Sequence, residues 1–230
     1  MRMRDITVVK LGGSQAGSPH LGGWLDALAG CGGRVVLVPG GGPFADAVRE
    51  AQTKIGFDDA AAHHMALLAM EQFGCALANL RRIFRIAGSV TAIRQTLRQG
   101  GVPVWAPKMM VLQSVIPASW DVTSDSLAAW LAGRLGARQL LIIKSRAPGA
   151  DPASAADLAT RGVVDRAFPH FLAESGAEAA IAGAGDHAGA AAALRRGELF
   201  GVRIGLHERE ARGLHSPSWP RSRHRAGAGR

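Results

Sequence analysis

The sequence of 230 residues predicts an α/β fold in which helices cover both faces of an open, mainly parallel central sheet. Strand signals rich in Val, Ile and Leu alternate with segments long enough for helical crossovers. The apolar runs at 34–39 and 138–143 show no polar alternation, which indicates strands that are buried on both faces. A composition of 47% apolar and 20% charged residues fits an ordinary soluble globular protein.

Six strands are expected along the chain, at residues 5–11, 34–40, 102–107, 138–144, 177–183 and 200–206. A helix is expected to begin near Pro43, because proline suits the first helical turn. The longest helical segment, residues 58–86, opens with Asp58 and Asp59 as candidate caps. Its length also suits an interface of a homo-oligomer.

A further helix is expected at residues 121–137. Thr123, Ser124 and Asp125 are candidate caps at its start, and Asp121 lies four residues before Asp125, on the same side of a helical start. A carboxylate there could hold two lysines in place at a phosphoryl-transfer site. Helix capping alone explains these residues equally well.

Two strands end in glycine-rich loops. The first runs into Lys10, Gly12, Gly13 and Ser14, and the second into Gly40, Gly41 and Gly42. Bare backbones at one sheet edge let several N–H groups point at one anion, beside a lysine and the positive end of a helix. Each loop alone is a weak signal, but together they predict a phosphate-sized cradle.

Other familiar sites are not indicated. The chain has no GxxxxGK[ST] motif, and the run from Gly183 to Gly189 has the wrong spacing for a dinucleotide fingerprint, so a dehydrogenase is disfavoured. Cys31 and Cys75 lack CxxC partners, which predicts buried free thiols and neither a zinc site nor a disulfide framework.

The net charge of +9 is spread along the chain, which argues against a specific nucleic-acid partner. The segment 207–230 has six Arg and two Glu and is rich in Pro, Gly and Ser, so it is predicted to be a disordered basic tail. No run of eighteen apolar residues and no secretory signal are found in the sequence, which predicts a cytoplasmic protein without a membrane partner.

Several motifs carry a resemblance to a known family. "VVKLGGS", "VVLVPGGGPFADAVRE" and "SWDVTSDSLAAWLAGRLGARQLLIIK" resemble motifs of the amino acid kinase superfamily, which includes acetylglutamate, aspartate and uridylate kinases. "AHHMALLAMEQFG" and "DRAFPHFL" resemble the branch that phosphorylates 5-(aminomethyl)-3-furanmethanol phosphate in methanofuran synthesis. The likeness implies a three-layer αβα sandwich. It also implies one domain at 1–206, with an acceptor lobe at about 1–145 and a nucleotide lobe at about 146–206.

The resemblance also implies roles for the site residues. Lys10 matches the lysine that stabilises the migrating phosphoryl group, Asp125 matches the aspartate that organises the lysines, and the glycines of both loops match those that approach the phosphoryl. The expected substrate contacts are Ser14, Arg49, His63, Asp121, Thr123 and Ser124, and the expected nucleotide contacts are Lys144, Gly183 and Gly185.

Lys144 marks a departure from the family. The strand ends in "IIKSRAPG", where many relatives have "TDVDG", and the segment that carries a second lysine in acetylglutamate kinases is missing. Lys144 ends an apolar strand at the edge where ligands bind in open α/β sheets. It therefore needs a counter-charge, for which Asp125 and the nucleotide phosphates are the candidates. Either Lys144 replaces the missing lysine or the nucleotide lobe is altered, and the alternative to a ligand role is a lysine that reaches solvent over the loop.

The expected function is a small-molecule kinase that transfers the γ-phosphoryl group of ATP to a phosphate monoester. The first candidate acceptor is 5-(aminomethyl)-3-furanmethanol phosphate, which would become a diphosphate. Mg²⁺ would be held mainly by the nucleotide, so no protein ligand is assigned. The alternatives are an acetylglutamate-, aspartate- or uridylate-kinase-like enzyme, and a non-catalytic protein of the same fold that binds anions or nucleotides.

Overall fold

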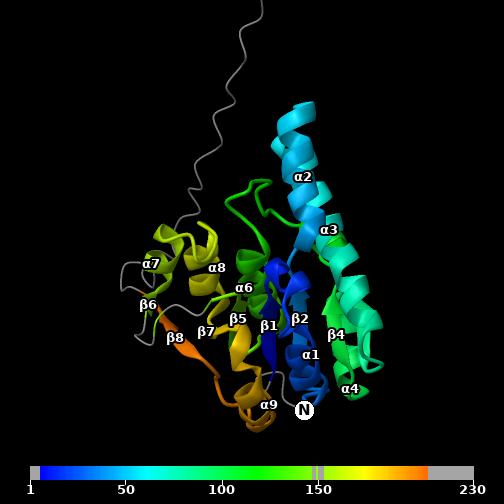
Figure 1. Ribbon diagram of the computed structural model, residues 1–230, viewed down its shortest axis with the longest axis vertical. Coiled ribbons are helices and arrows are strands. Elements are labelled where there is room, and N and C mark those ends of the chain that lie inside the picture. The colour runs from blue at the N-terminus through cyan, green and yellow to red at the C-terminus, as the bar shows by residue number, and fades with distance from the viewer. Residues whose placement is uncertain (1–5, 147–148, 150–152, 207–230) are drawn as a thin grey trace, which may run out of the picture.

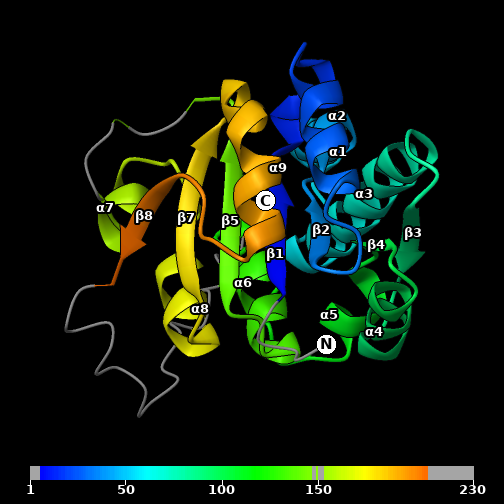
Figure 2. The same cartoon turned by 90° about the horizontal axis from the view of Figure 1, so that it is seen from below.

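The computed structural model describes residues 6–146, 149 and 153–206. Within them, an eight-stranded sheet lies between two layers of helices (Figures 1 and 2), which confirms the predicted three-layer α/β architecture. The strand order is β3-β4-β2-β1-β5-β7-β8-β6, and only the β7–β8 pair is antiparallel. The predicted tail at 207–230 lies outside the described residues.

The strands are β1 (Thr7–Leu11), β2 (Val35–Pro39), β3 (Phe84–Ala87), β4 (Val102–Trp105), β5 (Gln139–Lys144), β6 (Ala153–Ser154), β7 (Glu178–Gly183) and β8 (Val202–Gly205). The α-helices are α1 (Leu21–Ala29), α2 (Gly42–Ile55), α3 (Asp59–Asn79), α4 (Val90–Arg98), α5 (Lys108–Leu112), α6 (Ser124–Leu135), α7 (Ala155–Thr160), α8 (Phe168–Ser175) and α9 (His187–Arg196). Two short 3₁₀ helices, η2 (Gly13–Gly17) and η3 (Ala184–Asp186), follow β1 and β7.

The two faces of the sheet form two hydrophobic cores, because successive side chains of a strand point to opposite faces. Val8 of β1 packs in the core that contains Leu127 of α6 and Phe168 of α8. Val9 packs in the other core, with Trp24 of α1. Each such large apolar side chain stabilises the fold by about 1.5–3 kcal/mol when it is fully buried. This alternation also decides where the polar residues at the strand ends point.

The predicted helix at 58–86 is too long. Asp58 caps α3, as expected, by accepting a hydrogen bond from Ala61 N, but the helix ends at Asn79. Residues 84–87 form the edge strand β3, which pairs with β4. A four-residue edge strand with apolar residues at Phe84 and Ile86 cannot be told from a continuing helix by its pattern alone. The pairing with β4 decides the outcome.

Three smaller expectations are also corrected. The helix predicted at 121–137 spans Ser124–Leu135, so Asp121 lies before it. Cys31 is buried, as expected, but Cys75 is exposed on α3. The two-residue strand β6 was not expected, because it exists only through its pairing with β8. Part of the loop expected at 146–156 lies outside the described residues, and its end forms β6 and the start of α7.

Some apolar side chains remain on the surface. Three examples are Met65 in α3, Leu80 directly after α3, and Ile86 in β3, which are between 38% and 49% exposed. Single exposed apolar side chains are common on protein surfaces, so the homo-oligomer stays a prediction. Within the described part of the chain, every helix is too short or not apolar enough to span a bilayer.

The glycine loops after β1 and β2 touch one another through their backbones. A Cβ atom on Gly13 would lie 2.4 Å from Gly42 N, and a Cβ atom on Gly40 would lie 2.4 Å from Gly13 N. Such distances are far below van der Waals contact, so a side chain at either position would push the two loops apart. The glycines are therefore needed for close packing as well as for any ligand.

Replacing Gly13 by alanine is expected to lower the free energy of unfolding by about 1–3 kcal/mol, as overpacking usually does. Urea denaturation measures this change. Gly17→Ala in the same 3₁₀ helix is the matched control, because its Cβ would meet nothing within 4 Å. It should change stability by less than about 0.5 kcal/mol. Equal stability of the two variants would mean that the loops separate without cost.

Candidate active site

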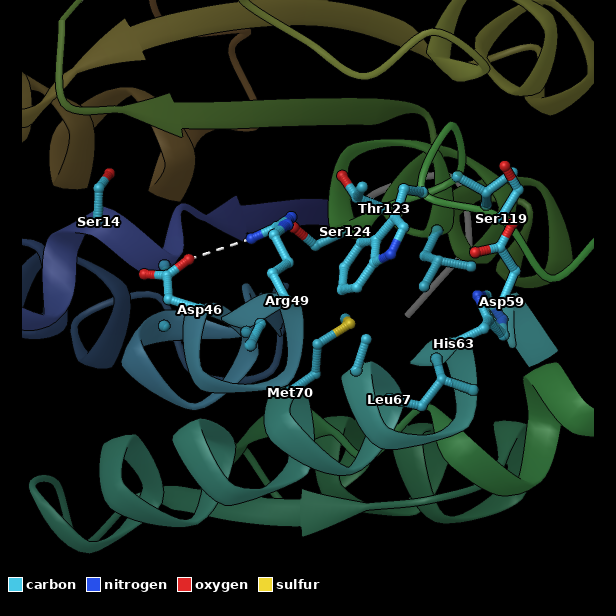
Figure 3. Close-up of a pocket in the computed structure, with 18 residues that line it drawn as sticks. Ser14, Asp46, Arg49, Asp59, His63, Leu67, Met70, Ser119, Thr123 and Ser124 are labelled. Carbon is cyan, nitrogen blue, oxygen red and sulfur yellow. Dashed lines mark hydrogen bonds and ion pairs between the residues drawn. The ribbon is translucent and has the colours of Figure 1, made fainter. Parts of the chain in front are cut away.

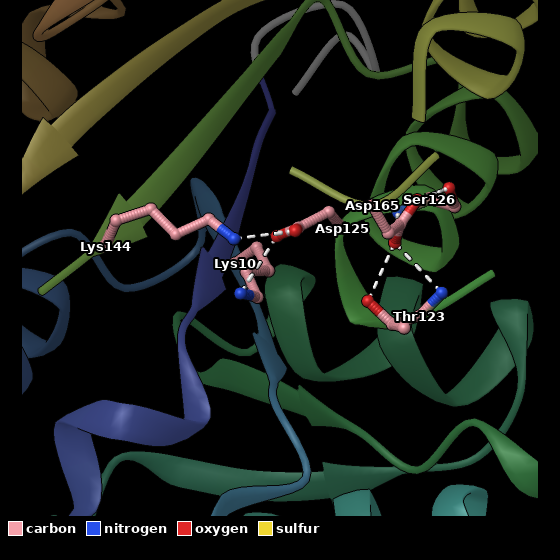
Figure 4. Close-up of polar contacts among 6 residues, drawn as sticks. All are labelled: Lys10, Thr123, Asp125, Ser126, Lys144 and Asp165. Atoms are coloured by element: carbon pink, nitrogen blue, oxygen red, sulfur yellow. Dashed lines mark hydrogen bonds and ion pairs between the residues drawn. The ribbon is translucent and has the colours of Figure 1, made fainter. Parts of the chain in front are cut away.

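Lys10 and Lys144 meet at one carboxylate. Side chains alternate along a strand, so the side chain of Lys10 points to the same face of the sheet as Val8, the face covered by α6, and Val9 points to the other face. On the neighbouring strand β5, Lys144 points to the α6 face for the same reason, like Ile142. Their Nζ atoms lie 2.9 Å and 2.6 Å from the two carboxylate oxygens of Asp125 (Figure 4). Asp125 is therefore the counter-charge that Lys144 was expected to need.

Charge and burial act together on this cluster. Burial lowers the pKa of Lys10, and the nearby charge of Lys144 lowers it further, while Asp125 opposes both effects. Burial by itself would raise the pKa of Asp125, but Lys10 and Lys144 outweigh it and hold that pKa below its ordinary value. Asp125 is thus ionised at neutral pH, and it joins two cations that would otherwise repel each other.

Asp165 supports the same site, and sequence reasoning did not identify it as a site residue. Its carboxylate accepts hydrogen bonds from Thr123 N (2.9 Å), Thr123 Oγ1 (2.8 Å) and Ser126 N (3.0 Å), and also from Ser126 Oγ. Burial and the charge of Asp125 raise the pKa of Asp165, and these hydrogen bonds oppose the increase. The residue stands in the quoted "DRAFPHFL" motif, but nothing in that motif reveals its partner.

Residues at the starts of three helical segments, η2, α2 and α6, lie around one space. The N–H groups of Gly13, Ser14, Gly41, Gly42 and Ser124 donate to no acceptor among the described residues. Gly41 and Gly42 open α2, and Ser124 opens α6, so two positive helix ends face the same space. The two glycine loops thus lie where the predicted anion cradle would be, and anion binding there stays a prediction.

The donors line a cavity of about 250 Å³. Figure 3 shows Arg49 of α2, with Leu67 and Met70 of α3, facing Thr123 and Ser124 across it. One end of the cavity is thus rich in N–H donors, and Ala66, Leu67 and Met70 of α3 form an apolar part of its wall. This arrangement suits a small molecule that carries an anionic group and an apolar body.

Trp120 forms a further wall that sequence reasoning did not assign. The guanidinium carbon of Arg49 lies 4.3 Å from the centroid of the Trp120 ring. Trp120 Nε1 donates to Gln52 Oε1 (2.7 Å), and Gln52 Nε2 donates to Asp59 Oδ1 (3.0 Å). Residues of α2 and α3 therefore hold the indole in place. Arg49 also lines the cavity and donates a hydrogen bond to Asp46 Oδ1 (3.1 Å). Asp46 therefore neutralises part of the positive charge of Arg49.

His63 lines the same cavity from α3. Only 8% of the residue is exposed, and its Nε2 atom has no hydrogen-bond partner within the part of the chain that the structure describes. Burial lowers the pKa of His63, and the charge of the neighbouring His64 lowers it further. The imidazole is therefore neutral at pH 7, and it keeps a hydrogen-bonding nitrogen available for a ligand.

Other predicted site residues lie elsewhere. Asp121 lies outside the cavity lining, and its carboxylate is 3.9 Å from Arg166, with which it shares the surface. Gly183 is the register partner of Lys144, but its N–H donates to Asp186 Oδ2 (2.7 Å). Gly185 has open space around it, so sterics do not require a glycine there. The loop after β7 does lie beside Lys144, at the expected sheet edge.

The described residues contain no group of three or more His, Cys, Asp or Glu side chains arranged to hold a metal ion. Mg²⁺ in phosphoryl-transfer enzymes is usually bound by one or two carboxylates together with the phosphates of the nucleotide.

Comparisons with known proteins identify the family of the chain. The sequence model of the amino acid kinase family matches residues 5–147. A curated relative, the [5-(aminomethyl)furan-3-yl]methyl phosphate kinase of Methanocaldococcus jannaschii, is 26% identical over 149 residues, which cover 60% of this chain and 68% of the relative.

Solved structures share the fold at low identity. A uridylate kinase from Archaeoglobus fulgidus matches with a TM-score of 0.66 at 17% identity, over 87% of this chain and 100% of that one. A UMP kinase from Bacillus anthracis gives 0.62 at 15%, over 87% and 96%. An isopentenyl phosphate kinase gives 0.59 at 16%, over 87% and 100%.

Proposed function

Because the chain belongs to the amino acid kinase family, we propose that it transfers the γ-phosphoryl group of ATP to a small phosphate monoester bound in the cavity. The observation that carries this proposal is the position of the open N–H groups. Donors on Gly13, Gly42 and Ser124 face one cavity, next to two lysines that share one carboxylate. Phosphoryl transfer needs such fixed donors and positive charges around the migrating group.

The transfer needs no covalent intermediate on the protein. An oxygen of the acceptor phosphate attacks the γ-phosphorus in line, and the bond from that phosphorus to the β,γ-bridging oxygen breaks. The bridging oxygen keeps the bonding electron pair and leaves with ADP. In this mechanism Lys10 and Lys144 offset the charge on the transferred group and on the leaving oxygen. Their contacts with Asp125, which would keep both ammonium groups in position, support these roles. A magnesium ion bound to the nucleotide would supply further positive charge.

The two ligands would occupy opposite sides of the lysine pair. The acceptor would lie in the cavity at α2, α3 and the start of α6, and the nucleotide would lie over the carboxyl ends of β5 and β7, near Lys144 and Gly183. His63, with its free Nε2, and Arg49 are proposed contacts for the acceptor phosphate. The proposed boundary between the lobes, at 1–145 and 146–206, falls just after Lys144, so β5 would contact the nucleotide from the acceptor lobe.

The acceptor that we propose is 5-(aminomethyl)-3-furanmethanol phosphate. The name of the curated relative supports it, although the identity is 26%. The cavity of about 250 Å³ is also smaller than the roughly 300–1,000 Å³ that is usual for drug-sized ligands, which favours a small acceptor. Uridylate and isopentenyl phosphate are the rival acceptors, since proteins named for them share the fold.

The test is an assay of ADP formation with ATP and magnesium against the aminomethylfuran phosphate, UMP, isopentenyl phosphate and N-acetylglutamate. The highest kcat/KM is expected for the furan phosphate, with a diphosphate as the product. A preference for UMP or acetylglutamate would move the protein to another branch of the family. Binding of ATP without turnover of any acceptor would favour the non-catalytic alternative.

Replacing Trp120 by alanine is expected to raise the KM of the acceptor by about 10- to 100-fold, because one wall of the cavity is lost. The KM of ATP should change much less. Steady-state kinetics with each substrate varied in turn separates the two effects. Trp120→Phe is the matched control, since it keeps an aromatic wall and loses only the hydrogen bond to Gln52. An unchanged acceptor KM in Trp120→Ala would place the acceptor elsewhere.

A further inference from the structure

Helix α6 is capped by a residue from a distant part of the chain. Thr123 stands at the N-cap position, but its side chain does not cap the helix. Asp165, from the connection between α7 and α8, accepts hydrogen bonds from the backbone N–H groups of Thr123 and Ser126 and from both of their hydroxyl groups (Figure 4). The first turn of α6 is thus held from outside by one carboxylate.

The segment around Asp165 is itself fixed against α6. Ala167 N donates to Asp121 O (3.0 Å), and Phe168 N donates to Asp165 O (3.2 Å), at the start of α8. Phe168 is fully buried, in the same core as Leu127 of α6. The polar contacts at the start of the helix and the apolar contacts along it leave the carboxylate of Asp165 little freedom to move.

The turn that Asp165 holds also carries Asp125. The carboxylate of Asp125 must reach Lys10 on β1 and Lys144 on β5 at the same time, at 2.9 Å and 2.6 Å. A small rotation of the first turn of α6 would break at least one of these contacts. The geometry of the lysine pair therefore depends on how firmly this turn is held.

Stability alone gives a weak reason for a second carboxylate at this place. Asp165 is buried close to the charge of Asp125, and both effects raise its pKa above the ordinary value. Two buried carboxylates in one small region carry a cost in free energy. A neutral cap would hold a helix start at a lower cost, but it could not accept four hydrogen bonds in this arrangement.

We propose that Asp165 is a positioning residue for phosphoryl transfer, which acts through its hydrogen bonds to Thr123 and Ser126 and keeps Asp125 in contact with both lysines. Asp165 need not touch either substrate. It links the α7–α8 segment, which follows Lys144 in the chain, to the helix start that faces the acceptor cavity. The prediction for kcat rests on the proposed kinase function, whereas the prediction for the position of Asp125 does not.

The kinetic test compares Asp165→Ala with Asp165→Asn. The alanine variant should lose about 100-fold in kcat, as small displacements of catalytic groups can cause, and should keep the KM of ATP within about threefold. The asparagine variant should recover to within about tenfold of the wild type, because its carbonyl can accept the N–H bonds and its amide can donate to Ser126 Oγ. Wild-type kcat in the alanine variant, or equal losses in both variants, would overturn the proposal.

Ser89→Ala is the matched control for the loss of a helix cap. Ser89 Oγ accepts a hydrogen bond from Ala92 N (3.1 Å) at the start of α4, outside the residues that line the cavity. This variant should lower the melting temperature and leave kcat unchanged. An equal loss of kcat in Ser89→Ala would show that the effect of Asp165 is a general loss of stability.

Crystal structures of the Asp165 variants test the positioning without turnover. In Asp165→Ala the distance from Asp125 Oδ2 to Lys144 Nζ should exceed about 4 Å, the usual limit of an ion pair, and in Asp165→Asn it should stay near 2.6 Å. Intact contacts in the alanine variant would refute the proposal. Broken contacts in a protein that phosphorylates no acceptor would refute the kinase function and leave the positioning role standing.

If Asp165→Ala does not fold, Ser126→Ala takes its place. This change removes one of the four hydrogen bonds from a buried hydroxyl and adds no volume. A net loss of about 1 kcal/mol in holding the helix start corresponds to about a fivefold fall in kcat. An unchanged kcat, with Asp165→Asn also at the wild-type value, would overturn the proposal.

Discussion

Replacing Lys10 by alanine is expected to lower kcat by about 1,000-fold, while the dissociation constant of ATP changes by less than about threefold. Lys10 is only 4% exposed and lies between Asp125 and the glycine loop, where a Cβ on Gly12 would come within 3.6 Å of its Nζ. Its ammonium group is placed to act on charge that develops during transfer, so its loss should affect the transition state more than the ground state. Steady-state kinetics and calorimetric titration with ATP measure the two quantities.

Lys54→Ala is the matched control for Lys10→Ala. The Lys54 side chain is 70% exposed and pairs with Glu50 on the surface of α2, so the variant should keep wild-type kinetics. Circular dichroism must show that Lys10→Ala is folded at the assay temperature, since removal of one partner of a buried ion pair is costly. A folded Lys10→Ala protein with full kcat would remove Lys10 from the mechanism.

Replacing Lys144 by methionine is expected to weaken ATP binding by about tenfold and to lower kcat by about 100-fold, with the fold intact. Lys144 ends β5, its side chain is 20% exposed, and its Nζ donates to Asp125 Oδ2 at 2.6 Å. The exposed part of the side chain can reach a nucleotide phosphate, while Asp125 keeps the ammonium group at the site. Both the ground state and the transition state should therefore lose a favourable charge. The same kinetics and titrations measure both changes.

Lys144→Arg tests the shape of the charge at the same position. It should rescue ATP binding more than kcat, because a planar guanidinium does not reproduce the compact point charge of an ammonium group. Lys54→Met is the control for the loss of a lysine on the surface. Unaltered kinetics in Lys144→Met would mean that Lys10 and the backbone hold the transferred group without Lys144.

Most of the fold follows from local patterns in the sequence. β-branched and apolar runs mark β1, β2, β4, β5 and β7, because strands that are buried on both faces read as continuous apolar segments. The more exposed strand β8 was predicted from its residue types alone. The proline after the glycine triplet marks the start of α2 for an equally local reason. Strands β3 and β6 were not predicted, since each is short and is defined by the strand with which it pairs.

The candidate site likewise has residues that the sequence singled out and residues that only the tertiary structure reveals. Residue types and their spacing along the chain were enough to single out Lys10, both glycine loops and Lys144, because a charge or a bare backbone at the end of a buried strand is conspicuous in a single sequence. For Asp125 the residues alone fitted a helix cap equally well, and its role beside the lysines was implied by the family resemblance. Only the tertiary structure shows that Asp125 joins the two lysines and that Asp121 lies apart. Only the tertiary structure brings Asp165 to the start of α6, and Trp120 and Arg49 to one wall of the cavity. These contacts join residues that lie tens of positions apart, and the packing of α6 against α8, and of α2 against α3, decides which side chains meet.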